Sequence, residues 1–327
     1  MMSSLYGPAS GRRASAHLVF VTALCLLSSA CGGGGNGQSP GVGNDQSGGN
    51  GGSSGGGSGS GSGGTGGGSG TGNSDVPATT LSCNGFPNTV QIVTSTGQQT
   101  FTRVCNIVQE FAQVTPSLGV TVDSGTLTGH GVDMLSSYVV YARIVAQAAD
   151  QGTATALANS VVINTANGSV SATPDQVDYP EQLVIDFEVF TAPSTNLTLM
   201  TNAGGLNVDN YNATLQLTTA AGDTSLSNLQ GQVTVNTTAG VINAALTGSG
   251  WSGAGLTATT QSGAIQVTRP AGYQAAFTAT TDQGSASIDT QSAVSAGPPA
   301  QPAVVTAGSG APISLESKKG NVTVSVK

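Results

Sequence analysis

The chain has 327 residues and a formal net charge of −8, with 7% charged and 4% aromatic residues. A nucleic-acid partner needs a basic surface that neutralises phosphates, and the eight lysines and arginines are too few and too scattered to form one, which argues strongly against nucleic-acid binding. Abundant Thr, Ser, Ala and Val with little charge are typical of regular stacks of β-strands rather than of a helical enzyme core.

The N-terminus has the pattern of an export signal. Two arginines precede an apolar run, Leu18–Leu27, that is too short to span a bilayer. Small residues and Cys31 follow, and this resembles a bacterial lipoprotein signal, in which the cysteine is diacylated and becomes the new N-terminus. The sequence thus predicts a signal peptide over residues 1–30 and lipid attachment at Cys31. An ordinary cleaved signal is the alternative, because Ser28 stands where the lipoprotein pattern prefers leucine.

Residues 31–75 consist of Cys31 and a linker made mostly of glycine and serine. Such a chain behaves as a flexible coil with a root-mean-square reach of roughly 35–40 Å. Behind a lipid on Cys31, the linker would let the folded part stand clear of the membrane. We expect an exported protein anchored in the cell membrane or outer membrane, with its folded domain in the periplasm or at the cell surface. A disordered segment of no selected length is the alternative.

Cys83 and Cys105 are the cysteines that remain once the signal region is set aside. They flank an expected hairpin, Val90–Val93 with Phe101–Val104, so in an exported chain they are predicted to form a disulfide. Closing that loop would stabilise the fold by about 3 kcal/mol. A metal site is not expected, because His130 is the only histidine beyond the signal and no Cys-x-x-Cys occurs. No cofactor is expected either.

Residues 76–160 are predicted to form short strands and one short helix. The segment Gln147–Ser160 is rich in alanine, which has high helix propensity, and Thr153 suits a helix start. A helix there would cap the first open edge of a stack of strands.

From residue 161 to the end, one unit of about 18–23 residues recurs. Each unit is marked by a glycine in a turn, and the markers are Gly168, Gly204, Gly222, Gly240, Gly263, Gly284 and Gly320. Two separations are twice the basic step, which fits either a rung with a long loop or two rungs of which one is degenerate. Apolar residues stand seven and five positions before every marker and four positions after it, a period of two on each side of a turn.

A unit of this size cannot bury an apolar face alone, so neighbouring units must stack into a continuous core. We predict an all-β fold over residues 161–327: a single-stranded parallel β-helix, or solenoid, of the right-handed kind. A left-handed hexapeptide helix fits poorly, because it needs an aliphatic residue at every sixth position. A sandwich of β-hairpins is the stronger alternative, since turn signals at this spacing also suit it.

A column of hydroxyl side chains stands three residues before each marker glycine. Its members are Thr165, Thr201, Thr219, Thr237, Thr260, Thr281 and Ser317. The favoured interpretation is structural, because a hydroxyl at a strand end can bond the backbone of the turn. The alternative is a flat threonine array of the kind that binds ice or a polysaccharide.

The segment LTGSGWSGAGLTATTQSGAIQV, residues 246–267, has a corner at Trp251, and a Pro270–Tyr273 turn follows it. With the recurrent Thr-x-x-Gly turns, these features resemble the bacterial putative-adhesin domain family related to auto-transporter adhesin head domains. The resemblance covers about residue 108 to the end. It implies a β-helical domain on exported, often membrane-attached proteins, with no established catalytic residues. A Pro-rich stretch, Ser295–Pro312, departs from the family pattern.

The sequence holds no nucleophile elbow, phosphate-binding loop or metal-ligand spacing. His130 follows a glycine in a turn-rich stretch and is interpreted as structural or exposed. Asp186 and Glu188 share one face of the strand LVIDFEVF. Paired carboxylates could serve a glycosidase or bind Ca²⁺, but a solvated strand face is the favoured interpretation.

Three functions are therefore weighed. The first is a non-enzymatic, lipid-anchored envelope protein whose solenoid binds an unidentified glycan or protein. The second is a carbohydrate-active β-helix enzyme, and the third is a purely structural envelope spacer. The low charge and the lack of catalytic motifs favour the first.

Overall fold

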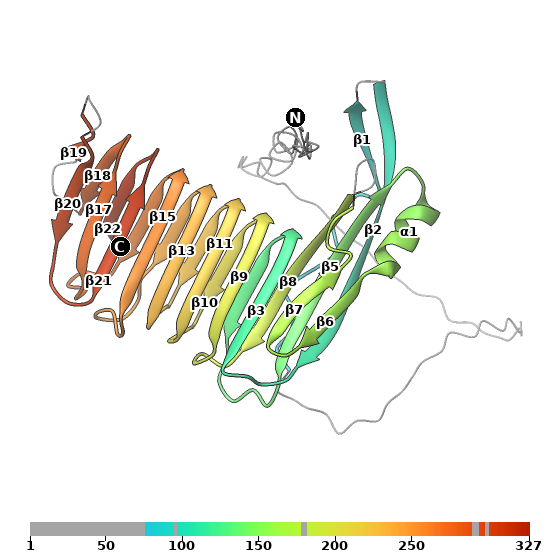
Figure 1. The fold of residues 1–327 in the computed structure, drawn as a ribbon, viewed down its shortest axis with the longest axis horizontal. Helices are drawn as coiled ribbons and strands as arrows, with labels where there is room; N and C mark the ends of the chain where they lie inside the picture. Colours follow the sequence, from blue (N-terminus) through green and yellow to red (C-terminus); the bar gives the residue numbers. More distant parts are fainter. Residues whose placement is uncertain (1–75, 95–96, 178–181, 290–293, 298–300) are drawn as a thin grey trace, which may run out of the picture. The chain divides into compact units, whose positions relative to one another are not determined.

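A computed structural model describes residues 76–94, 97–177, 182–289, 294–297 and 301–327 of the chain (Figure 1). The predicted signal, the lipid-attachment residue Cys31 and the Gly/Ser linker lie outside the described residues. Nearly all of the regular structure is strand, and the single helix of the described part is α1 (Gln151–Ser160). None of the described helical structure is long and apolar enough to cross a membrane.

The strands form two sheets, here called sheet A and sheet B. In spatial order, sheet A contains β1 (Thr89–Thr94), β2 (Gly97–Ala112), β5 (Tyr138–Ala148), β8 (Gln182–Thr191), β4 (Leu127–Gly131), β10 (Leu206–Asp209), β12 (Thr224–Ser227), β14 (Ile242–Ala245), β16 (Ile265–Arg269), β22 (Val322–Val326), β18 (Ser285–Ile288) and β19 (Val294–Ser295). Sheet B contains β20 (Ala303–Ala307), β17 (Ala276–Thr281), β21 (Pro312–Ser317), β15 (Gly255–Ser262), β13 (Gln232–Ala239), β11 (Thr214–Ala221), β9 (Asn196–Ala203), β3 (Ser117–Ser124), β7 (Ser169–Thr173) and β6 (Val162–Ala166).

The repeating unit, here called a rung, is a longer strand in sheet B, a glycine turn and a shorter strand in sheet A. Rungs stack side by side with parallel pairing, as Figure 1 shows from β9 to β15. In sheet B, Leu215 pairs with Leu197 on one side and with Val233 on the other, in the register that the sequence columns predict. This parallel pairing rules out the sandwich of hairpins for the middle of the domain. The fold is all-β and solenoid-like.

The stack does not follow chain order at its C-terminal end. The rung β21–β22, which comes last in the sequence, lies between the rungs β15–β16 and β17–β18. The chain passes over one position, forms the antiparallel edge strands β19 and β20, and then returns to fill the gap. The long separation between Gly284 and Gly320 is therefore an excursion, not a degenerate rung.

The N-terminal end has the same kind of inversion. The rung β3–β4 lies between β7–β8, which follows it in the sequence, and β9–β10. The expected boundary at residue 161 is thus not a boundary of the stack, because residues 117–131 already form a rung. The predicted helix is present, but its N-cap is Asp150, whose carboxylate accepts from the Thr153 amide at 2.9 Å. α1 packs on β2 and β5 through Ala154 and Ala158, and so covers a sheet face and not an edge.

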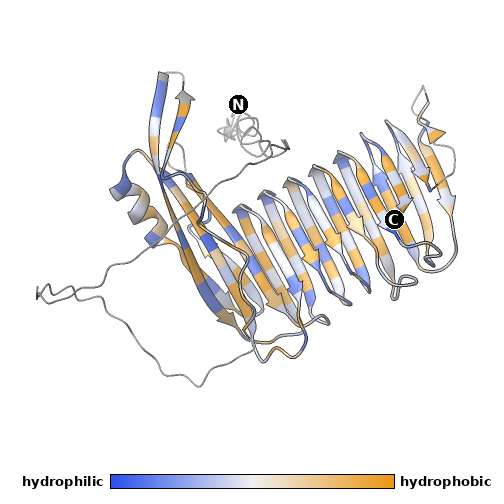
Figure 2. Ribbon diagram, turned by 180° about the vertical axis from the view of Figure 1, so that it is seen from behind, coloured by the Kyte–Doolittle hydropathy of each residue, from blue (hydrophilic) through white to orange (hydrophobic). Residues whose placement is uncertain are grey.

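The core is the space between the two sheets. Hydrophobic and hydrophilic residues alternate along the strands (Figure 2), and the inward side chains form apolar columns. The sheet B column Leu197, Leu215, Val233, Leu256, Ile313 and Phe277 is at most 3% exposed throughout. Burial of each such side chain away from water contributes roughly 1.5–3 kcal/mol to the free energy of folding.

The marker glycines form a ladder at the turns between the sheets. A Cβ placed on Gly222 would lie 2.1 Å from the Gly204 carbonyl oxygen, and one on Gly240 the same distance from that of Gly222. In spatial order the ladder runs Gly125, Gly204, Gly222, Gly240, Gly263, Gly320 and Gly284. Gly168 does lie in a turn, but in the antiparallel β6–β7 hairpin, and Gly125 takes the place in the ladder that the sequence pattern gave to Gly168.

Six of the seven column residues are buried, and five of them bond the glycine ladder, whereas Thr165 is half-buried in β6 and donates to the Phe111 carbonyl at 3.3 Å. The Oγ1 of Thr219 donates to the Gly204 carbonyl at 3.0 Å, and five of the seven residues make this bond to the preceding glycine of the ladder: Thr201, Thr219, Thr260, Thr281 and Ser317. These five are at most 4% exposed. The structural interpretation is correct for them, and the exposed threonine array is wrong because the hydroxyls face the core.

Three buried hydroxyls find no hydrogen-bond partner among the described residues, those of Thr224, Thr237 and Tyr273, and Thr224 lies among purely apolar neighbours of its column. Thr224 stands in the inward column of sheet A between Leu206 and Ile242, is 0% exposed, and finds no hydrogen-bond partner among the described residues. An unpaired buried hydroxyl costs about 1–3 kcal/mol. We expect Thr224→Val to raise the free energy of unfolding by about 1 kcal/mol, measured by urea denaturation. The matched change Thr219→Val should lower it by a similar amount, and equal effects of the two would contradict this account.

Candidate functional site

Residues 76–88, here called the strap, cross the outer face of sheet A without joining either sheet. Val76 and Leu81 pack on a small apolar cluster of Val139, Tyr141 and Phe190 that faces away from the main core. The sheet therefore has a second buried surface, beneath the strap, that the period-two pattern alone does not reveal.

The predicted cysteine pair ties the strap down. Cys83 and Cys105 are joined in the structure, with their Cα atoms 5.8 Å apart, so the strap is linked covalently to β2. The expected hairpin of Val90–Val93 with Phe101–Val104 is the antiparallel pair β1–β2 inside that covalent loop.

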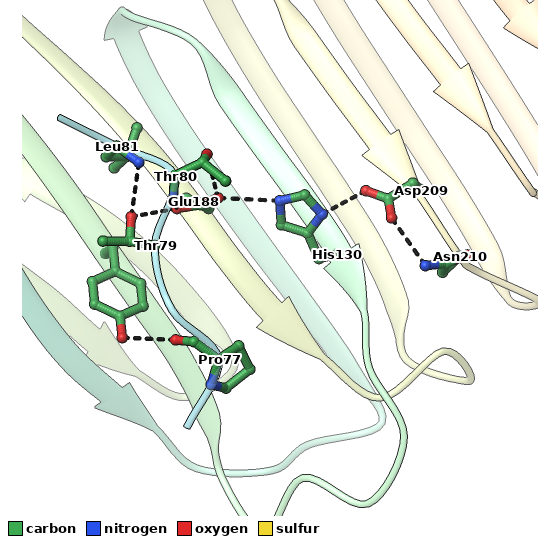
Figure 3. Close-up of polar contacts among 9 residues, drawn as sticks. Pro77, Thr79, Thr80, Leu81, His130, Glu188, Asp209 and Asn210 are labelled. Atoms are coloured by element: carbon green, nitrogen blue, oxygen red, sulfur yellow. Dashed lines mark hydrogen bonds and ion pairs between the residues drawn. The ribbon is translucent and has the colours of Figure 1, made fainter. Parts of the chain in front are cut away.

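Glu188 on β8 is the centre of the contact between strap and sheet (Figure 3). Its carboxylate accepts hydrogen bonds from the Thr80 amide at 2.9 Å, from the Thr80 hydroxyl at 2.7 Å and from the Thr79 hydroxyl. The Tyr141 hydroxyl donates to the Pro77 carbonyl at 2.9 Å. Glu188 points outward as the alternation predicts, but it is 0% exposed, so the expected solvated face is wrong because the strap covers it.

His130 on β4 extends this network to the open part of sheet A. Its Nε2 lies 3.2 Å from Glu188 Oε1 and its Nδ1 lies 2.5 Å from Asp209 Oδ1 on β10. Its ring stacks on Phe190 with centroids 4.8 Å apart. Both ring nitrogens face carboxylates, and both donate only when the imidazole is protonated. His130 is therefore structural, as one of the two interpretations held, and it joins strands separated by long stretches of sequence.

The protonation of this group follows from its surroundings. The hydrogen bond that the His130 ring donates to the Asp209 carboxylate raises the pKa of His130, burial opposes that shift, and the charges of both carboxylates add to it. Burial raises the pKa of Glu188, but the bonds from Thr79 and Thr80 and the charge of His130 outweigh burial, and the net pKa lies below the ordinary value. Both shifts favour the ion pair of a protonated His130 with a deprotonated Glu188.

The sign of the pH dependence follows by linkage. The stabilisation from His130 is complete below its unfolded pKa, near 6.5, and is lost as the pH rises through the raised folded value. The stabilisation from Glu188 is complete above its unfolded pKa, near 4.5, and is lost as the pH falls through the lowered folded value. The network is most stable between these two transitions.

Asp186, the second carboxylate on the outer face of β8, also has all its partners within the protein, an arginine and a backbone amide. Arg143 on β5 contacts it at 2.7 Å through Nη2 and at 2.9 Å through Nε, and the Thr126 amide donates to it at 2.7 Å. The Arg143 guanidinium also donates to the Ser82 carbonyl of the strap and lies over the Phe86 ring. The two carboxylates on β8 therefore serve different partners and do not form an open catalytic pair.

A different feature, here called the sheet B groove, lies on the outer face of the other sheet. It has a volume of about 390 Å³ and is lined by one outward residue from each of five successive strands, Thr121, Met200, Thr218, Asn236 and Thr259. At strand spacings near 4.8 Å the row is roughly 19 Å long. The charged residues of its lining are Asp123 and Asp175, and Asp123 accepts a hydrogen bond from the side-chain Nδ2 of Asn202 at 2.6 Å.

The sequence pattern gave no signal for the strap network and only an indirect one for the groove. Glu188 and Thr80 are 108 residues apart, and no periodicity connects them. The groove follows from the outward columns once the register is known. In the described part of the chain, no group of three or more His, Cys, Asp or Glu side chains is arranged to hold a metal ion.

Comparisons with known proteins identify a family. The model of the Toastrack DUF4097 family matches residues 88–325, which is most of the chain. A search of the curated proteins finds no match.

Solved structures give weaker likenesses. A putative cell adhesion protein from Clostridium sporogenes is 11% identical, covers 68% of this chain and 100% of its own, and has a TM-score of 0.36. A putative adhesin from Bacteroides fragilis is 12% identical, with 68% and 97% covered and a TM-score of 0.31. A putative lipid binding protein from Parabacteroides distasonis is 11% identical, with the same coverages and a TM-score of 0.26. Because these TM-scores are below 0.5, the likenesses establish neither fold nor ligand.

Proposed function

The chain belongs to the Toastrack DUF4097 family, and from this premise we propose that it is a non-enzymatic, lipid-anchored protein of the cell envelope whose solenoid is an interaction module. The proposal includes export by the signal of residues 1–30, a lipid on Cys31 and the linker to residue 75 as a tether. It also takes the solenoid to be right-handed, the hand of nearly all crossovers between parallel strands.

The sheet B groove is the observation that supports an interaction role. Its central row consists of hydroxyl and amide side chains with one methionine, and it has no basic residue. Anionic partners find no complementary charge there, and a protein partner would find few of the aromatic or arginine anchors that dominate protein interfaces. An uncharged, hydroxyl-rich chain such as a neutral glycan fits best, because Thr, Asn and Gln side chains can both donate and accept hydrogen bonds.

The alternative of a carbohydrate-active enzyme rested mainly on Asp186 and Glu188 as candidate catalytic carboxylates. Asp186 is bound by Arg143 and Thr126, and Glu188 is bound by the strap and His130, so neither carboxylate is free to act on a substrate. Replacing the pair with Asn and Gln should leave binding in the sheet B groove intact. If the parent chain hydrolysed a cell-wall polysaccharide and the double variant did not, the hypothesis of a carbohydrate-active enzyme would be supported again.

A binding experiment tests the groove. The purified full-length chain is applied to an array of neutral and acidic glycans, with a pulldown from envelope extract beside it. We expect retention of neutral glycans, weakened at least ten-fold by Thr218→Arg, which places a long charged side chain in the groove. Thr323→Arg, at an exposed position of β22 in sheet A, is the matched control and should bind as the parent does. A chain that retains neither glycan nor protein is a structural spacer.

The anchor is tested separately in cells. A chain with Cys31 should incorporate labelled palmitate and stay with the membrane fraction, and Cys31→Ala should do neither, because the proposal places the lipid on that residue. Membrane association of Cys31→Ala equal to that of the parent would contradict lipid anchoring and leave the groove proposal untouched.

A further inference from the structure

We propose that the outer face of β4, β5 and β8 is a binding site for an extended peptide segment with two successive threonines, that the chain's own strap fills this site, and that His130 controls whether the strap stays bound. The site is on sheet A, opposite the sheet B groove, and the proposal does not rest on glycan binding.

The strap is held as a bound peptide is held. No β-ladder joins it to a strand, and its contacts come from sheet side chains that reach its backbone: Tyr141 to the Pro77 carbonyl, Glu188 to the Thr80 amide and Arg143 to the Ser82 carbonyl. Apolar residues of the strap pack on the aromatic cluster. Backbone capture combined with side-chain pockets is a general mode of peptide recognition.

Release of residues 76–82 would leave both sheets paired. The strap is anchored at Cys83 by the disulfide to β2, so a released segment stays close to its site. Rebinding is then intramolecular, at a high effective concentration. The segment can open and close without unfolding the stack.

The two threonines give the site its specificity. Both hydroxyls and the Thr80 amide donate to Glu188, and a buried carboxylate without these donors would be costly. A segment with alanine at the two positions keeps the apolar packing but leaves Glu188 short of two donors. Recognition therefore depends on the hydroxyls.

His130 couples the site to pH. The groups that face it are Glu188 from β8 and Asp209 from β10, and the strap itself carries no charged side chain. Tyr141 on β5 is neutral, since burial and the charge of Glu188 raise its pKa. The neighbouring Asp186 is paired with Arg143. Loss of the His130 proton leaves one carboxylate facing a ring nitrogen lone pair, so the strap is held less tightly at high pH.

Hydrogen exchange of the full-length chain tests the control. After correction for intrinsic exchange rates, the Thr80 amide should lose at least ten-fold of its protection between pH 5.5 and pH 9. His130→Gln should show the lower protection at both pH values. The Gly222 amide, which donates to Ala239 within the stack, is the internal control and should not change. Constant protection of Thr80 in the parent, or an unchanged pH response in His130→Gln, would overturn the role of His130.

A peptide in trans tests the recognition. The probe is a fluorescein-labelled peptide with the sequence of residues 76–82, and the host is the full-length chain with Thr79→Ala and Thr80→Ala. We expect saturable binding at pH 5.5, at least ten-fold weaker binding of a peptide with both threonines changed to alanine, and loss of binding when the host also carries Glu188→Gln. Equal binding of the two peptides overturns the proposal. The proposal is also overturned if the strap amides of the host stay protected from hydrogen exchange. It is overturned as well if the host's strap is released and the host still does not bind the probe.

Discussion

Replacement of Gly240 with valine is expected to lower the free energy of unfolding by at least about 3 kcal/mol. The glycine has φ +150°, a conformation that side-chain-bearing residues rarely adopt, and an added Cβ would lie 2.1 Å from the Gly222 carbonyl oxygen. Because the stacked rungs approach each other backbone to backbone at this turn, no flexible side chain can move aside. Thermal and urea denaturation of the purified chain would measure the loss.

Gly272→Ala separates backbone strain from steric clash. Gly272 also has a positive φ, +72°, but no atom of the described residues outside its chain neighbours lies within 4 Å of an added Cβ. This change should cost only about 1–2 kcal/mol, the ordinary cost of the left-handed region. If Gly240→Val unfolded no more readily than Gly272→Ala, the close contact of the ladder would not exist as described.

Replacement of Arg143 with methionine is expected to cost about 3 kcal/mol, because it leaves the Asp186 carboxylate buried without its cation. Asp186 is 5% exposed and keeps only the bond from the Thr126 amide. The same change also removes the bond to the strap carbonyl of Ser82. Urea denaturation near neutral pH would show the effect as a lower transition midpoint.

The double variant Arg143→Met with Asp186→Asn is the matched control. An asparagine can still accept from the Thr126 amide, and it carries no charge that needs a partner. At least half of the lost stability should therefore return. A single variant that lost less than about 1 kcal/mol would show that water reaches this pair despite its burial.

The middle of the domain could be predicted from the sequence, because the residues that set the pairing of its strands recur within each unit of about 18 residues. Leu215, Leu217 and Gly222 recur at a fixed spacing, so the register of neighbouring rungs follows from the columns. The inward direction of the Thr219 hydroxyl follows in the same way from alternation.

The ends of the stack and the strap could not be predicted, because their partners are distant in sequence. Nothing in the columns distinguishes the order Gly284 then Gly320 from the reverse, since both rungs present the same apolar faces. The burial of Glu188 depends on Thr80, which lies in a segment with no periodicity. Hydrophobic patterning fixes which face of a strand is apolar, and does not specify what covers the other face.

The inserted rung β21–β22 has a consequence for the time course of synthesis. The ribosome delivers residues 312–326 after every other rung, yet they occupy an interior position between β15–β16 and β17–β18. The stack therefore cannot be completed by adding each rung to a growing end, and the slot must stay open until the C-terminal residues emerge. For the export proposed above, in which an unfolded chain is carried through a membrane pore, such a delay would be an advantage.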